Sequence, residues 1–148
     1  MKTTLLACSL IITTILPLCA GTSAQEKEFT DKYKAAFEAN DAKTLQSFLY
    51  TTGADPMVLD FFKTAQTSDA GGKISKIELV DLTPEEVKKA AEPQDGPSGK
   101  ICPTLKPTKK LVITSAKKDA NGSSSGTSEF MVAEKDGQFV IPAPGPCK

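Results

Sequence analysis

The side chains that could carry acid–base chemistry in this chain are tyrosines, carboxylates and lysines, because the chain contains no histidine. Its absence excludes Ser-His-Asp and Cys-His nucleophile systems and histidine metal ligands. Any acid or base would need a pKa tuned by its surroundings. The candidates for such a pocket are Tyr33, Tyr50, Asp60, Glu78 and Glu129. Each also fits an ordinary half-exposed or cap-adjacent polar residue, so no residue is assigned as catalytic.

The basic residues narrow the ligand classes further, because every one of the 18 is a lysine, against 18 acidic residues. Without arginine the chain lacks the planar fork that binds carboxylates and phosphates bidentately. Gly71-Gly72 and Ser123-Ser124-Ser125-Gly126 do not match a phosphate-binding loop and read as turns. Positive and negative charges are interspersed along the chain, so we expect no nucleic-acid partner. The missing histidine and the missing phosphate loop lead us to expect no metal and no cofactor.

The N-terminus has the pattern of a secretory signal peptide. Lys2 precedes an apolar run from Thr3 to Leu18, and a small-residue stretch follows to Ala24. Cleavage after Ala24 would leave residues 25–148 as a single domain in the secreted or periplasmic space. The apolar run falls short of the roughly 20 residues that a membrane-spanning helix needs, and no later segment approaches that length.

Two short motifs leave alternatives open. Leu16-Pro17-Leu18-Cys19 resembles a bacterial lipobox, so a lipid anchor on Cys19 is the alternative to plain cleavage, although Leu18 is large where the motif has a small residue. Asn121-Gly122-Ser123 is an acceptor sequence for an N-linked glycan, but it is also fully explained as a turn.

Removal of the signal peptide leaves one pair of cysteines, Cys102 and Cys147. An even pair in an exported chain predicts a disulfide bond. A reactive thiol would need electropositive neighbours that lower its pKa, and Lys100 and Lys148 are near the cysteines in sequence but are not paired with a histidine. The bond would tie the proline-rich C-terminal tail to the segment before the last strands.

The first half of the domain has helical periodicity. Residues 26–40 place Phe29, Tyr33, Ala36 and Phe37 on one face, and a second short helical turn begins at Asp41. Asp55-Pro56 is typical of a third helix start. Its apolar stripe is Val58, Phe61, Phe62 and Ala65. We expect one core of Phe37, Phe61, Phe62, Phe130 and Phe139 between helices and sheet.

The second half predicts strands. A strand over 74–82 leads to a capping box, Thr83-Pro84-Glu85-Glu86, and a short helix over 84–91. A Pro/Gly-rich loop at 92–108 precedes strands at 109–117, 127–134 and 138–142. Residues 119–126 would form a mobile hairpin loop, and Asp136-Gly137 a tight turn. The fold class is therefore α+β, with N-terminal helices packed on an antiparallel sheet of about four strands.

This order of elements resembles the nuclear transport factor 2-like, or cystatin-like, superfamily. The resemblance rests on residues 33–45, YKAAFEANDAKTL, and on residues 130–141, FMVAEKDGQFVI. It implies a long first helix lying across a strongly curved sheet, with a cavity between them that relatives use for small molecules or partner proteins. Enzymes of the superfamily often place a histidine, aspartate or tyrosine there. This chain lacks the histidine and carries Phe139 where relatives commonly have tryptophan.

Three functional hypotheses follow from these observations. We favour an exported noncatalytic binding or accessory module for a small apolar ligand or a protein partner. The alternatives are a small enzyme with carboxylate and tyrosine chemistry in a cavity, and a protein-interaction or inhibitor domain. Tyr33 is expected to complete the apolar face of the first helix, with its hydroxyl at the wet end of the cavity or bonded to a backbone carbonyl.

Overall fold

The computed structural model describes residues 22–119 and 122–148. Its helices are α1 (Ser23–Glu38), α2 (Ala42–Ser47), α3 (Pro56–Thr67) and α4 (Pro84–Ala91). Its strands are β1 (Leu49–Tyr50), β2 (Lys73–Asp81), β3 (Gln94–Gly96), β4 (Gly99–Cys102), β5 (Lys109–Asp119), β6 (Gly122–Lys135), β7 (Gln138–Pro142) and β8 (Gly145–Pro146). The lipobox cysteine Cys19, most of the predicted signal peptide and the glycan acceptor Asn121 lie outside the described residues.

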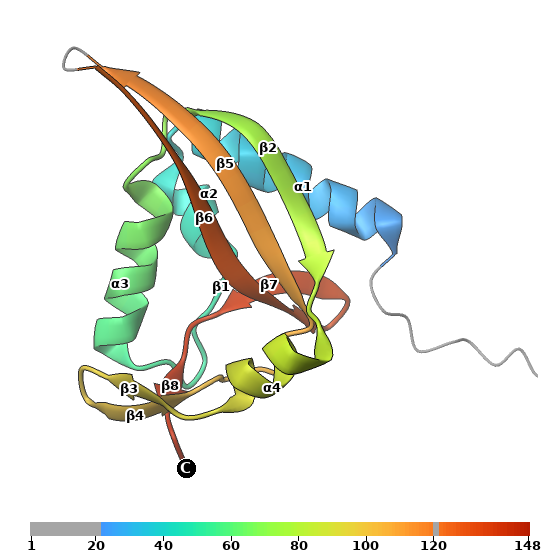
Figure 1. The fold of residues 1–148 in the computed structure, drawn as a ribbon, viewed down its shortest axis with the longest axis vertical. Helices are drawn as coiled ribbons and strands as arrows, with labels where there is room; N and C mark the ends of the chain where they lie inside the picture. Colours follow the sequence, from blue (N-terminus) through green and yellow to red (C-terminus); the bar gives the residue numbers. More distant parts are fainter. Residues whose placement is uncertain (1–21, 120–121) are drawn as a thin grey trace, which may run out of the picture.

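The strands form two sheets. The larger sheet has the order β1-β7-β6-β5-β2, and the smaller one has the order β3-β4-β8. Every pairing in the larger sheet is antiparallel except that of β1 with β7, which is parallel. Helix α1 crosses behind β5 and β2, and α3 stands beside β6 (Figure 1). The α+β prediction is confirmed, with β1 as a fifth strand that the sequence pattern did not indicate.

The predicted helix starts are confirmed by their caps. The side chains of Asp41 and Asp55 accept hydrogen bonds from backbone N–H groups at the starts of α2 and α3. Thr83 and Glu86 form the expected capping box at the start of α4. A second capping box, centred on Thr22, starts α1 at Ser23. Cleavage after Ala24 would therefore fall within the first turn of α1 and remove its N-cap.

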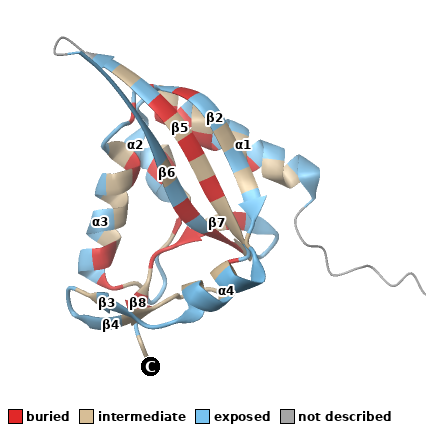
Figure 2. Cartoon of the chain, in the orientation of Figure 1, coloured by how far each residue is buried: buried red, intermediate tan, exposed pale blue. Residues whose placement is uncertain are grey.

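The core lies between α1, α2 and the sheet. Helix α1 buries Phe29, Tyr33, Ala36 and Phe37, as the periodicity predicts. Helix α2 contributes Leu45. The sheet and the loops contribute Leu49, Ala70, Ile74, Leu111, Ile113, Phe130, Val132, Phe139 and Ile141. Buried positions alternate with half-buried ones from Leu111 to Ser115 of β5 (Figure 2), so one face of this strand faces the core. Within the described residues, no helix is both long enough and apolar enough to cross a membrane.

The prediction that Phe61 belongs to this core is wrong. Helix α3 buries Val58 and Gln66 and packs Phe62 and Ala65 against the core, whereas Phe61 is 67% exposed. The inward positions 58, 62, 65 and 66 follow helical spacing, and Phe61 lies at the edge of that stripe. Apolar periodicity indicated a stripe that includes Phe61, but the core covers only the part that carries Val58, Phe62 and Ala65.

Two loop predictions also need correction. The segment 92–108 contains the β3–β4 hairpin rather than continuous loop. The expected mobile loop at 119–126 is mostly strand, because β5 and β6 pair out to Asp119 and Gly122. The serines and glycines of β6 pair through backbone groups, which need no apolar side chains. Apolar alternation therefore stops before the strand does.

Candidate binding groove

A groove of about 740 Å³ lies between α3, the β3–β4 hairpin, one edge of β6 and the C-terminal tail. We call it the α3–β6 groove. Its volume is within the range of small-molecule sites. Its lining residues are Met57, Val58, Phe61, Phe62, Ala65, Ala90, Glu92, Gln94, Asp95, Gly96, Pro97, Ile101, Cys102, Pro103, Pro107, Ser128, Glu129, Phe130, Met131, Pro142 and Pro144.

The α3 wall presents two large apolar side chains to solvent, Met57 at 60% and Phe61 at 67% exposure. The start of the helix is fixed by the buried Asp55, whose carboxylate accepts hydrogen bonds from the backbone N–H groups of Met57 and Val58. These bonds, with that from Val58 foremost, lower the pKa of Asp55. The backbone N–H of Asp55 donates to the Pro144 carbonyl, so this wall is tied to the tail.

Residues 128–131 of β6 form the floor of the groove. The ring of Phe130, 9% exposed, lies 6.4 Å from that of Phe62, which lies 6.3 Å from that of Phe61. Met131, the next residue of β6, is 40% exposed. A chain of aromatic contacts thus runs from the core to the surface of the groove.

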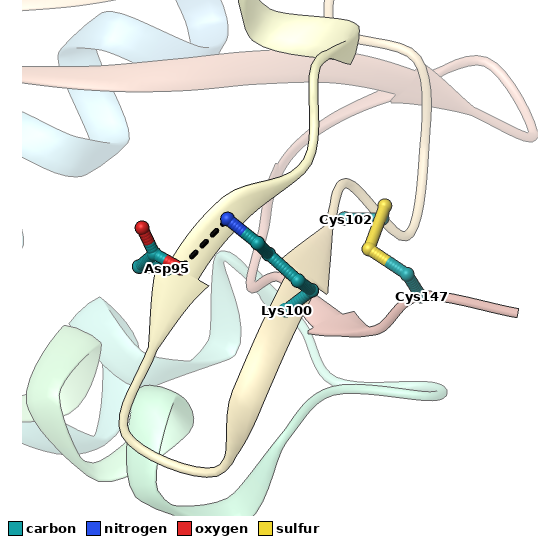
Figure 3. The surroundings of a disulfide bond; sticks show 4 residues. All are labelled: Asp95, Lys100, Cys102 and Cys147. Carbon is teal, nitrogen blue, oxygen red and sulfur yellow. Dashed lines mark ion pairs between the residues drawn. A yellow bond between two sulfur atoms is a disulfide. The ribbon is translucent and has the colours of Figure 1, made fainter.

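The remaining wall is stiffened by covalent chemistry. Five of the lining residues are prolines, three of them in the 97–107 segment, one at the end of β7 and one in the tail. The predicted disulfide is present and joins Cys102, at the end of β4, to Cys147, just after β8 (Figure 3). Prolines and a cross-link restrict the unbound conformations of this wall, so the groove loses little freedom on binding.

The charged residues that line the groove are all acidic: Glu92, Asp95 and Glu129. Asp95 pairs with Lys100 across the β3–β4 hairpin at 2.7 Å (Figure 3). Glu129 is 3.8 Å from the amine of Lys110, which binds Glu86 at 2.7 Å. That closer contact lowers the pKa of Glu86 to about 2 and raises the pKa of Lys110. Glu129 is therefore the less tightly held of the two acids.

The structure does not bring the five candidate pocket residues together. Glu129 lines the groove, and Tyr33 lies on the buried face of α1. Asp60 lies on the exposed side of α3 and pairs with Lys63 at 3.3 Å. Glu78 lies on β2 and pairs with Lys76 at 2.9 Å, and Tyr50 is half-buried on β1. In the described residues, no group of three or more acidic, cysteine or histidine side chains could hold a metal ion.

Tyr33 differs from the expectation at its hydroxyl, which does not reach solvent or a backbone carbonyl. The side chain is fully buried, with its ring 5.3 Å from that of Phe48. The hydroxyl and both polar atoms of the Gln66 amide are buried without a hydrogen-bond partner among the described residues. Burial raises the pKa of Tyr33, and the nearby Gln66 offsets only part of that rise. The two groups are neighbours, but their geometry is not that of a formed hydrogen bond.

Replacing both groups with apolar ones of similar shape is expected to stabilise the protein. Tyr33→Phe alone and Gln66→Met alone should each change the free energy of unfolding by about 1 kcal/mol or less. The double variant should gain about 1 to 3 kcal/mol, because it removes every unpaired polar atom from this part of the core. Urea unfolding of the four proteins tests this. A double variant less stable than wild type would mean that a hydrogen-bonded network holds the pair.

Tyr33 should also make the fold sensitive to alkali. Its folded pKa is above that of an unfolded tyrosine, about 10, so the stability it contributes is present below pH 10 and is lost as pH rises further. The slope approaches about 1.4 kcal/mol per pH unit for one such group. Tyr33→Phe should lose less stability than wild type between pH 10 and pH 11.5. Identical pH profiles would contradict this assignment.

A second hollow, of about 760 Å³, lies between α1, α2 and β7. Its apolar members include Phe29, Phe48 and Phe139, whose rings pack on one another at 5.3 and 5.8 Å. The apolar surface of those rings is largely covered by their contacts with one another. The side chains of Met57, Phe61 and Met131 leave large apolar surface exposed to solvent. The α3–β6 groove is therefore the stronger candidate site.

Sequence reasoning missed most of the groove. Of the five expected pocket residues only Glu129 lines it, and Met57 and Met131 were not singled out. The signal that could have found it was the proline cluster in 93–107, because prolines restrict the backbone and favour a rigid wall over a flexible loop. Comparison of the chain with protein-family models, with curated proteins and with solved structures finds no match. Membership of the nuclear transport factor 2-like superfamily therefore stays a prediction.

Proposed function

We propose that this chain is an exported noncatalytic binding module that holds an apolar part of its ligand in the α3–β6 groove. The observation that carries the proposal is the convergence of Met57, Phe61 and Met131, all strongly exposed, on one rigid groove. Large apolar side chains that gather at a concave site are typical of binding surfaces. The disulfide bond is compatible with an oxidising, extracytoplasmic setting.

The energetics support binding of moderate strength. Covering a side chain such as Phe61 or Met57 removes apolar surface from water and contributes about 1.5 to 3 kcal/mol for full burial. Several such contacts offset the loss of translational and rotational freedom only when the site does not also have to be ordered. The disulfide and the five prolines supply that order before the ligand arrives.

The test is fluorescence of N-phenyl-1-naphthylamine, a neutral apolar dye that brightens on leaving water. We expect saturable binding, weakened about fivefold or more in Phe61→Ala, since loss of a stacking ring removes on the order of 1 kcal/mol or more. The matched control is Val80→Ala, which trims an exposed apolar residue on β2 outside the groove. Equal affinity in wild type and Phe61→Ala, or no binding at all, would refute the proposal.

A further inference from the structure

Strand β6 has a free edge where it borders the groove. Strand β5 pairs with β6 along Gly122–Val132, but β7 pairs only with Ala133–Lys135. On the side away from β5, the stretch Gly122–Val132 therefore has no strand partner among the described residues. This edge faces α3 (Figure 1), and its segment from Ser128 to Met131 lines the α3–β6 groove.

We propose that the ligand of the groove is an extended peptide segment that adds a strand to this edge of β6. The inference rests on the proposed function and names its ligand class. A paired strand would satisfy the outward-facing N–H and C=O groups of β6, which a small apolar molecule cannot do. Alternate side chains of the peptide would then enter the apolar space beside Phe61, Phe62 and Met57.

The composition of β6 keeps this edge open to pairing. The opposite edge of the sheet, β2, is blunted in the usual way, by lysines and acids along its length and by a register shift between Ile74 and Lys76. In β6, the stretch Gly122–Val132 has no lysine, no proline and no register shift against β5. Glu129 is its one charged residue. The strand therefore lacks the usual devices that prevent edge pairing.

The charges at the groove specify the peptide further. Glu92, Asp95 and Glu129 line it, and no lysine does. Asp95 remains 91% exposed despite its pairing with Lys100, Glu129 is 55% exposed, and Glu92 makes no ion pair in the described part of the chain. A lysine or arginine on the peptide would complement this acidic rim, whereas an acidic peptide would be repelled.

The experiment is an NMR titration of ¹⁵N-labelled protein with the capped peptide Ac-VKVTVKVT-NH₂. Two further peptides carry N-methyl groups on either the odd or the even residues, which blocks one edge of the peptide at a time without changing its side chains. We expect shifts centred on Ser128–Met131. One methylation pattern should bind like the parent and the other about tenfold or more weakly, because only one edge can pair with β6.

The charge is tested with Ac-VEVTVEVT-NH₂, expected to bind about tenfold more weakly at low salt. That difference should shrink to about twofold or less in Glu92→Gln/Asp95→Asn/Glu129→Gln, whose fold is checked by circular dichroism. Glu86 stays in place as the closer partner of Lys110, so α4 keeps its ion pair. An unchanged preference in this variant would overturn the assignment of the acidic rim.

Other results would overturn the strand-addition proposal as a whole. Equal binding of both methylated peptides would show that side chains alone are recognised. A concentration-dependent dimer in analytical ultracentrifugation, with Ser128–Met131 shielded, would assign the edge to a second copy of the chain. Naphthylamine binding with no peptide shift at about 1 mM would refute strand addition and leave the proposed function intact, whereas loss of both would refute both.

Discussion

Phe130→Ala is expected to lower the free energy of unfolding by about 3 to 5 kcal/mol, and Phe61→Ala by about 1 kcal/mol or less. Phe130 is 9% exposed and packs on Phe62 and the core, so its truncation leaves a cavity. About two thirds of the surface of Phe61 is exposed to solvent, so its truncation should lower the free energy of unfolding only slightly. Both variants remove the same number of atoms, so the difference between them reports mainly burial, with a smaller part from the preference of alanine for helix α3 over strand β6. Chemical denaturation with a common m-value measures it.

The same pair of variants separates stability from binding. Phe61→Ala should keep its unfolding midpoint and lose dye affinity, because its ring faces the groove. If Phe61→Ala lowered the free energy of unfolding by about 3 kcal/mol or more, Phe61 would be a core residue and would not line an open groove. A loss below about 1 kcal/mol in Phe130→Ala would show that β6 does not pack on α3 as described.

Local signals in the sequence predicted the elements whose causes are local. Asp41, Asp55 and Thr83 each start a helix because their side chains bind backbone N–H groups two or three residues away. The face of α1 could be read from the spacing of Phe29, Tyr33 and Phe37, since all three are buried against α2 and the sheet. The disulfide followed from cysteine parity.

The groove could not be predicted because its causes are distant in the chain. The exposure of Phe61 depends on how much of α3 the sheet covers, and periodicity within α3 does not contain that information. The free edge of β6 exists because β7 stops pairing at Ala133, which no local pattern in Gly122–Val132 reports. Ser128 and Met131 become site residues only through that long-range register.

Removing the disulfide, by Cys102→Ser/Cys147→Ser or by reduction, is expected to cost about 4 kcal/mol of stability. The bond joins residues 45 apart, and the chain-entropy estimate for a loop of this length gives that magnitude. Without the bond, the tail would be held by short β8 pairing, by the Asp55–Pro144 backbone bond and by the Thr104 hydroxyl bound to the Ala143 carbonyl. Guanidinium unfolding of the oxidised, reduced and double-serine proteins measures the loss.

Removal of the disulfide should also weaken ligand binding in the groove, because the bond anchors the wall that contains Pro103 and Pro144. A wall that must be ordered during binding adds an entropic cost, so dye affinity should fall about fivefold or more in the folded double-serine protein. Reduced wild type and the double-serine variant should agree, since serine leaves the surrounding backbone pairs intact. If stability fell by the expected amount but affinity stayed constant, the tail would already be ordered by its hydrogen bonds. The disulfide would then stabilise the fold without shaping the groove.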